Sequence, residues 1–175
     1  MTDKFNVNMD KDGMYWATAD TKDLENKYNE IINNEADWKV WQHKGIWCVI
    51  ARMDLQHLCG YIGLPSKIDI GSHTYEHPWF GSQYQEDCYY SLPVDVHGGI
   101  TWGPELTNHC PIPQFEINEK LTWIGFDCNH SCDWTPDSPS GEYRTMDYVK
   151  QECNKVVDDY YETLVDTLKT QIQKL

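Results

Sequence analysis

The sequence has few positive charges for its length. Its 175 residues include 14 lysines and arginines against 28 aspartates and glutamates, so the formal net charge is −14 at pH 7. Proteins that hold nucleic acids neutralise phosphates mainly with lysine and arginine, which excludes a nucleic-acid backbone as partner. A small phosphorylated ligand held by backbone amides or by one arginine is compatible with this charge. So is an acidic protein that occupies the groove of a basic partner.

Long hydrophobic runs are also absent. No segment approaches the roughly 18 consecutive apolar residues of a membrane span. The first residues, Met-Thr-Asp-Lys-Phe-Asn, lack the apolar stretch of a signal peptide. Hydrophobic residues make up 40% of the chain, which is enough for one core at this length. We expect a single domain over residues 1–175, with no membrane partner, in a reducing cytoplasm.

The sequence lacks the motifs of several common chemistries. Its seven cysteines form no Cys-x-x-Cys pair, so their spacings do not match the common zinc fingers. There is no Gly-x-Ser-x-Gly elbow and no lysine-bearing phosphate loop. His73 and His77 have the spacing of a zinc helix, but the glutamate is not in the required position. No motif therefore identifies an activated nucleophile.

Several segments do have the patterns of regular structure. Apolar residues recur at three- and four-residue steps from Met146 to Ile172, which predicts a long amphipathic helix over 145–174 with Thr145 as its N-cap. A shorter N-terminal helix is predicted over 21–34. Runs rich in β-forming residues predict strands at 46–53, 60–64, 93–102 and 121–127.

These elements predict an α+β fold, in which an antiparallel or mixed sheet of about four to six strands is covered by the C-terminal helix. That helix needs a partner surface, because helix propensity alone does not hold it. The sheet would supply the surface, or a second copy of the chain in a homo-oligomer. We expect residues 1–17 to be a flexible segment with a turn at Asp12-Gly13. Residues 66–91 are expected to form a long loop of a kind that is often functional, in which the segment 73–77 is a candidate lid over the site.

A polar cluster follows the predicted strand at 121–127. Asp127-x-x-His130-x-x-Asp133 places two carboxylates and an imidazole within seven residues. These groups suit a Zn, Mn or Fe ion, or general acid–base work on water, and His97 would complete the set. The spacing matches no defined ligand motif, so a turn in which the aspartates cap backbone amides is the alternative.

A second polar cluster runs from Asp95 to Thr101. The paired Gly98 and Gly99 allow the backbone to approach a ligand closely, and backbone amides there could hold an anion. The alternative is a β-bulge with His97 packed beside it. Two such strand ends in one small domain predict a shared pocket.

Aromatic residues next to these clusters are candidates for the wall of that pocket. Trp102 and Trp123 adjoin the clusters, and together with Phe126 they would supply apolar or stacking surface for a planar ligand. Core packing is the alternative explanation for each tryptophan. Arg144 is a candidate phosphate contact, because its planar fork suits phosphate oxygens.

Several motifs, in their order along the chain, resemble those of a family of small bacteriophage proteins. The resemblance covers residues 48–157, and the motifs that carry it are GYIGLP from Gly60, His77-Pro78, VDVHGGIT from Val94, WIGFDCNHSCD from Trp123, and Tyr143-Arg144 followed by Tyr148-Val149 and Glu152-Cys153. It implies a phage origin and the cytoplasm of an infected bacterial host, without a settled activity. Small phage accessory proteins are often counter-defence factors, which raises the expectation of such a role here.

The main hypothesis is a phage counter-defence protein that sequesters a small nucleotide-derived immune signal, without a cofactor and without catalysis. The residues expected to bind this ligand lie in the two clusters, in their aromatic neighbours and at one arginine: His97, Gly98, Gly99, Thr101, Trp102, Trp123, Phe126, Asp127, His130, Asp133 and Arg144.

Two alternatives belong to other functional classes. The first is a metal-dependent hydrolase or phosphodiesterase that destroys such a signal, with a divalent ion held by His97, Asp127, His130 and Asp133. The second is an acidic inhibitor that docks on a basic host defence protein through its −14 charge.

Overall fold

The computed structural model describes residues 6–9, 11, 13–18, 28–65, 67–70, 73–80, 92–103, 117, 121–138 and 141–173. The elements in chain order are β1 (Asn6–Met9), β2 (Tyr15–Thr18), α1 (Asn29–Asn34), β3 (Trp38–His43), β4 (Ile46–Arg52), β5 (Leu58–Leu64), β6 (Lys67–Ile70), β7 (His73–Glu76), the 3-10 helix η1 (Pro78–Phe80), β8 (Thr122–Asp127) and α2 (Met146–Ile172).

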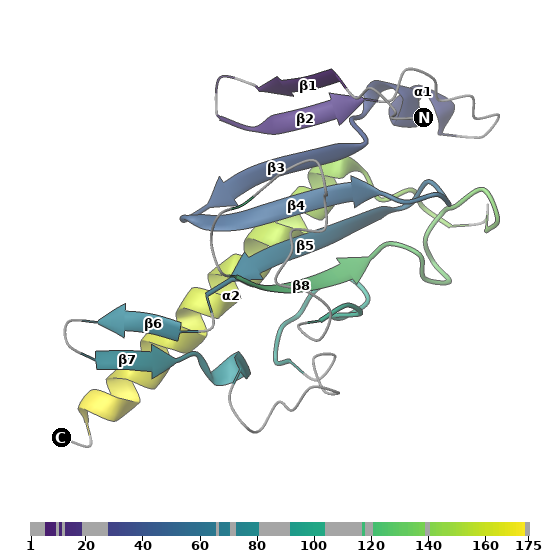
Figure 1. Cartoon of the computed structure of the whole chain (residues 1–175). Helices are drawn as coiled ribbons and strands as arrows, with labels where there is room; N and C mark the ends of the chain where they lie inside the picture. The colour runs from purple at the N-terminus through teal and green to yellow at the C-terminus, as the bar shows by residue number, and fades with distance from the viewer. Residues whose placement is uncertain are drawn as a thin grey trace.

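Six of the strands form one antiparallel sheet in the order β1-β2-β3-β4-β5-β8 (Figure 1). β8 is distant from β5 in the sequence but pairs with it, and Ile124 lies opposite Ile62. β6 and β7 form a separate two-stranded sheet. The predicted α+β class is therefore confirmed.

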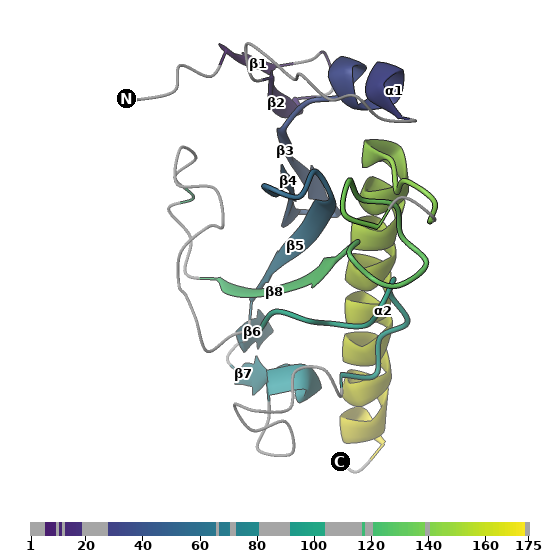
Figure 2. The ribbon, with the colours of Figure 1, turned by 90° about the vertical axis from the view of Figure 1, so that its right-hand side faces the viewer.

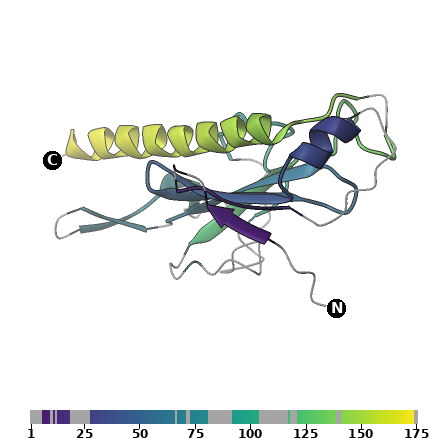
Figure 3. The same ribbon diagram turned by 90° about the horizontal axis from the view of Figure 1, so that it is seen from above.

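α2 lies along one face of the six-stranded sheet (Figures 2 and 3) and contacts β5 and β4. The Thr145 hydroxyl accepts a hydrogen bond from the Tyr148 N–H at 3.2 Å, which confirms the predicted N-cap. The helix buries an apolar stripe against the sheet, as its periodicity predicts. Among the residues that the structure describes, none of the helices combines the length and the apolar character that a bilayer crossing requires.

Buried side chains are divided between the two faces of the sheet. Side chains at every second position of a strand share a face. Cys48, Ile62 and Ile124 are neighbours across β4, β5 and β8, and they belong to the core beneath α2. Val49 and Trp123 are next to them in the chain and belong to the cluster on the opposite face. Neighbouring residues of one sequence motif are separated in this way.

A buried polar network, which we call the Glu35 cluster (Glu35, Asp37, Arg52 and Tyr143), ties α2 to the sheet. The Arg52 side chain is 4% exposed and donates to Glu35 Oε2 at 3.1 Å and to Tyr143 Oη at 2.6 Å. The Tyr143 hydroxyl donates to the same Glu35 oxygen at 2.6 Å. Glu35 Oε1 accepts the backbone N–H of Met146 at 2.7 Å and so satisfies a free amide at the start of α2.

The strand predicted at 93–102 is wrong. Within the described residues 92–103, Trp102 forms an isolated bridge with Gly125, and no strand is present. Gly98 and Gly99 have φ of +68° and +83°, in the left-handed region that strands do not use. The Gly99 N–H also closes a turn with the carbonyl three residues earlier. The glycines that suggested a ligand loop are thus the reason that the strand does not form.

The other segment predictions have mixed outcomes. The loop predicted at 66–91 is wrong in its first part, because β6, β7 and η1 lie there, while residues 81–91 lie outside the described residues. The helix predicted at 21–34 is confirmed for α1, whereas residues 21–27 lie outside the described residues. The segment 1–17 contains β1 and most of β2, paired antiparallel.

Candidate functional site

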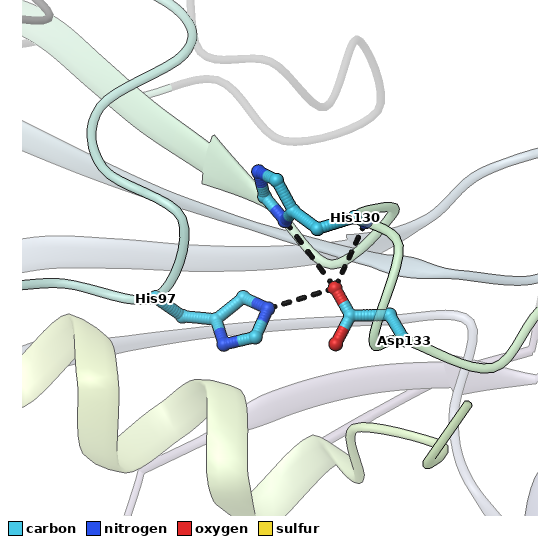
Figure 4. Close-up of side chains that lie close together, drawn as sticks. All are labelled: His97, His130 and Asp133. Atoms are coloured by element: carbon cyan, nitrogen blue, oxygen red, sulfur yellow. Dashed lines mark hydrogen bonds and ion pairs between the residues drawn. The ribbon is translucent and has the colours of Figure 1, made fainter.

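Side chains from two segments far apart in the sequence converge beside the N-terminal half of α2 (Figure 4). His97 comes from the loop at 92–103, and His130 and Asp133 come from the turn that follows β8. One ligand atom from each of the three side chains lies within 4.8 Å of the other two. We call this group the Asp133 cluster.

The Asp133 carboxylate accepts hydrogen bonds from four N–H groups. The residue is 0% exposed. Its Oδ2 accepts from His97 Nε2 at 2.8 Å, from the His130 backbone N–H at 3.0 Å and from His130 Nδ1 at 3.3 Å. Its Oδ1 accepts from Arg144 Nε at 2.8 Å. One oxygen therefore faces an arginine, while the other faces both imidazoles.

The surroundings of Asp133 keep it ionised at neutral pH. Burial by itself raises the pKa of this carboxyl. The hydrogen bonds from Arg144, from His97 and from the His130 backbone outweigh that effect and lower the pKa to about 2. In turn, the hydrogen bond to Asp133 raises the pKa of Arg144. The cluster thus holds a permanent negative charge between two imidazoles and a guanidinium.

His97 is held from α2 at two points. Its backbone N–H donates to Glu152 Oε2 at 2.7 Å, and its ring Nδ1 lies 3.0 Å from the Tyr148 hydroxyl. Because Nε2 donates to Asp133, the Nδ1 of a neutral ring accepts the hydrogen bond from Tyr148. The ring is therefore oriented on both nitrogens.

The turn at Gly98 is packed against the ring of His130. Gly98 has a φ of +68°, and a Cβ added there would overlap the imidazole of His130. Gly99 has a φ of +83° but nothing within 4 Å of an added Cβ. The paired glycines do bring backbone into close approach, but with a side chain of the cluster. Glycine at 98 is required for two independent reasons, conformation and space.

Arg144 supports the cluster. Its Nε holds Asp133, its Nη1 donates to Glu142 at 3.1 Å, and its guanidinium lies 5.2 Å from the centre of the Tyr148 ring. The side chain is 20% exposed. The sequence predicts a phosphate contact at this residue. The structure shows that its Nε is already committed to a carboxylate of the chain itself.

Asp127 lies apart from the Asp133 cluster. Its Oδ2 accepts the hydroxyl of Thr101 at 2.7 Å, and its Oδ1 accepts the backbone N–H of Asn129 at 3.0 Å. It pairs in register with Cys59, two residues before Tyr61, so alternation places its side chain on the sheet face away from α2. Asp127 thus caps a turn, which is the alternative that the spacing left open.

The aromatic residues expected around the ligand do not surround the Asp133 cluster. Trp102 packs edge-on against Tyr61, with 5.2 Å between the ring centres, and Trp123 is buried; both lie on the face away from α2. Phe126 is buried in the core beneath α2. The structure therefore brings together His97, Gly98, His130, Asp133 and Arg144, and it leaves the three aromatic residues as packing.

Tyr148 and Glu152 are site residues that the sequence analysis missed. They lie four and eight residues after Arg144, the spacing at which side chains follow one face of a helix. That spacing, in a segment predicted to be helical, is the signal that could have identified them.

The Asp133 cluster has the donor set of a catalytic metal site. Two imidazoles and one carboxylate leave coordination positions open for water or substrate. Bonds of about 2.0–2.2 Å to a shared ion place neighbouring ligand atoms about 3 Å apart. His97 Nε2 and His130 Nδ1 lie 2.8 and 3.3 Å from Asp133 Oδ2, so the residues fit an ion. Without an ion, the same groups are two imidazoles oriented for acid–base chemistry.

Comparison with known proteins leaves the function to be argued from this geometry. No protein-family model matches the chain, and no match is found among curated proteins or solved structures. The resemblance to small phage proteins therefore stays a prediction that rests on the motifs alone.

Proposed function

We propose that this protein is a metal-dependent hydrolase that acts on a small nucleotide-derived signalling molecule, and that it serves a phage in counter-defence. The observation that carries the proposal is the convergence of His97 Nε2 and His130 Nδ1 on one oxygen of Asp133, at 2.8 and 3.3 Å. The resemblance of its motifs to those of small phage proteins is the support for the proposed origin. The net charge of −14 argues against a nucleic-acid polymer as the substrate.

The ion would be held by His97, His130 and Asp133, without Asp127. Arg144 holds Asp133 Oδ1, and the ion would take the place of the two imidazole protons that Oδ2 now faces. A Zn or Mn ion bound there supplies a Lewis acid and an activated water at neutral pH. Loss of a residue that orients a metal ligand commonly lowers the affinity for the metal by about 10–100-fold. Tyr148 is such a residue, because its hydroxyl bonds His97 Nδ1.

The cluster is accessible from one side. The Asp133 side chain is 0% exposed, whereas that of His130 is 31% exposed. Gly98, which packs on the His130 ring, is also exposed. A small substrate can therefore reach the imidazole edge of the site, while the carboxylate stays shielded from water. An exposed imidazole edge above a buried carboxylate suits hydrolysis, because water does not weaken the interactions of the Asp133 charge.

Titration of chelator-treated protein with Zn and with Mn in a calorimeter tests the metal site. We expect saturable binding of one ion per chain, which His97→Ala and His130→Ala remove. His43→Ala is the matched control, because His43 bonds Asp158 at 2.8 Å and takes no part in the cluster. The absence of stoichiometric binding, or its persistence in both site variants, would overturn the proposal.

Turnover is measured separately, by chromatography of cyclic and linear nucleotide signals after incubation with metal-loaded protein. Products that appear with the wild type and with His43→Ala, and not with His130→Ala, support hydrolysis. Intact nucleotides in every sample contradict it, even if metal is bound.

Sequestration without chemistry is the second candidate function. The observation that favours it is that four N–H groups donate hydrogen bonds to the Asp133 carboxylate, so this charge is fully paired without a metal ion. The two functions differ in what is recovered when the protein is denatured after incubation. Sequestration returns the nucleotide unchanged and in proportion to protein, whereas hydrolysis returns products in excess of protein.

A further inference from the structure

A surface cavity of about 550 Å³ lies where β4 and β5 meet the turn after β8. Its lining includes Met53, Leu55 and His57 from the β4–β5 connection, and Asp127 and Asn129 from the segment that ends β8. Sites for small molecules commonly have volumes of about 300–1,000 Å³. The segment from Asp127 to Asp133 thus borders this cavity at one end and forms the Asp133 cluster at the other.

His57, which lines this cavity, has an unsatisfied polar atom. Its Nδ1 is buried and has no hydrogen-bond partner. Burial lowers the pKa of His57, although Asp127 and Asp133 act in the opposite direction, so the ring is neutral at pH 7. Buried polar atoms are nearly always paired, and an orphan in a native protein calls for an explanation. A ligand that induces rotation of the His57 ring and bonds its Nδ1 would remove the energetic cost of the unpaired atom.

The connection that bears His57 is itself conformationally unusual. The preceding residue, Gln56, has a φ of +65°, in the left-handed region that residues other than glycine rarely adopt. Backbone held in such a region is found preferentially at functional sites. The residue with the positive φ therefore directly precedes His57, which lines the cavity.

The charges of the lining define the ligand. The guanidinium of Arg52 is already bound to Glu35, Tyr143 and backbone carbonyls, so it offers no free fork to a phosphate. Asp54 and Asp127 line the same cavity, and a carboxylate can accept several hydrogen bonds. Among the described lining residues, acceptors thus outnumber available cations. Met53 and Leu55 add an apolar surface.

We propose that this cavity binds a neutral small molecule that donates hydrogen bonds from hydroxyl or amino groups and carries an apolar face, the chemical class of nucleosides. Asp54 and Asp127 would accept from the hydroxyl or amino groups, and rotation of the His57 ring would bring its unsatisfied nitrogen to the ligand. Met53 and Leu55 would contact the apolar face. The site is distinct from the Asp133 cluster and needs no metal.

Adenosine is the probe, and its effect on the backbone amide NMR spectrum of the full, metal-free chain is the measurement. We expect saturable shifts, at millimolar concentrations, confined to residues 53–59 and 127–129. Adenosine 5′-monophosphate should bind about fivefold more weakly, because its phosphate meets carboxylates. Leu55→Trp should fill the cavity and weaken adenosine binding about tenfold or more.

Met9→Trp is the matched control, since Met9 on β1 is 62% exposed and Leu55 is 41% exposed. It should leave the adenosine shifts unchanged. Unmoved amides at 53–59, or equal binding by wild type and Leu55→Trp, would overturn the proposal. Tighter binding of the monophosphate would also overturn it. Because the titration uses no metal, its result does not depend on whether the Asp133 cluster is a hydrolase site.

Discussion

The Asp133 cluster and the Glu35 cluster are built from similar groups beside the same end of α2. Each centres on a carboxylate that accepts hydrogen bonds from an arginine and from a backbone N–H. They differ in access and in chemistry. The Arg52 side chain is 4% exposed and no imidazole joins it, whereas the Asp133 cluster contains two imidazoles, of which His130 is 31% exposed.

This difference separates a structural network from a candidate site. A guanidinium stays charged at all ordinary pH values and cannot bind a metal, and in the Glu35 cluster Arg52 holds both carboxylates in buried ion pairs, which is a structural arrangement. An imidazole can give up its proton and bind an ion through the same nitrogen. The same ionic geometry therefore stabilises the fold in one place and offers ligands in the other. Each cluster should respond to its own measurement, stability or metal affinity.

The largest effect is expected from Arg52→Met. Its removal leaves Glu35 and Asp37 without their shared buried cation, which should lower the free energy of unfolding by about 3–5 kcal/mol. Unfolding in guanidinium chloride measures the loss, and metal affinity of the folded protein should be unchanged. A loss below about 1 kcal/mol is typical of a surface ion pair. It would show that the Glu35 cluster is not a major stabilising network, and the contrast with the Asp133 cluster would fail.

Asp133→Asn should change the metal affinity of the Asp133 cluster. We expect the affinity for Zn to fall by at least about 100-fold, because the variant loses the charged oxygen on which both imidazoles converge. Asp127→Asn is the matched control from the same motif, and it should keep the wild-type affinity for Zn, since Asp127 bonds Thr101 and Asn129 and lies outside the Asp133 cluster. Equal losses in both variants would mean that Asp127 belongs to the metal site.

Acid should reveal the stability that the Asp133 charge contributes. The pKa of Asp133 is lowered from 3.8 to about 2, so the unfolded chain binds this proton first as the pH falls. Its contribution, about 2 kcal/mol, is present above pH 3.8 and is lost as the pH approaches 2. The difference between wild type and Asp133→Asn in unfolding free energy should shrink over this range. A constant difference would contradict the assignment.

The two glycines of the turn allow the effect of backbone strain to be separated from the effect of a contact with the His130 ring. Gly99→Ala should lower the free energy of unfolding by about 1–2 kcal/mol because of its positive φ, and Gly98→Ala should lower it by more, because its Cβ would also overlap the His130 ring. Only Gly98→Ala should also weaken metal binding, since its Cβ would displace the His130 ring. Calorimetry on the two proteins side by side makes this comparison. Equal metal affinities would show that the ring has room to move.

The smallest effects are expected from removal of a single hydroxyl in each cluster. Tyr148→Phe should weaken metal binding about tenfold with little change in stability, because it frees His97 Nδ1. Tyr143→Phe should lower the free energy of unfolding by about 1–2 kcal/mol and leave metal affinity unchanged. If both hydroxyls affected both quantities, the two clusters would have to be treated as one network.

Elements with a long repeating pattern could be predicted from the sequence. α2 has 27 residues of helical periodicity and a capping threonine, and β4, β5 and β8 are apolar runs rich in β-forming residues. The strands β1, β2, β6 and β7 have four residues each, too few to show a period. The false strand at 93–102 has a convincing composition, but its glycines adopt left-handed backbone.

The candidate site could be predicted in part. Of the four residues proposed to hold a metal, His97, His130 and Asp133 come together, while Asp127 does not. Asp127 is still in β8, where alternation directs its side chain to the other face, and the chain turns only after it. The same alternation removes Trp123 from the site. Spacing within a motif does not show where a strand ends and a turn begins.

The sequence by itself determined the class of fold, the acidic charge and the candidate metal ligands, because these follow from composition and local periodicity. Tertiary structure decided which of those residues meet. His97 and Asp133 are 36 positions apart, and His97 depends on Tyr148, 51 positions away. Contacts of this range arise only when α2 packs against the sheet and brings its polar face to two loops. No local pattern encodes that packing, since it depends on the shape of both surfaces at once.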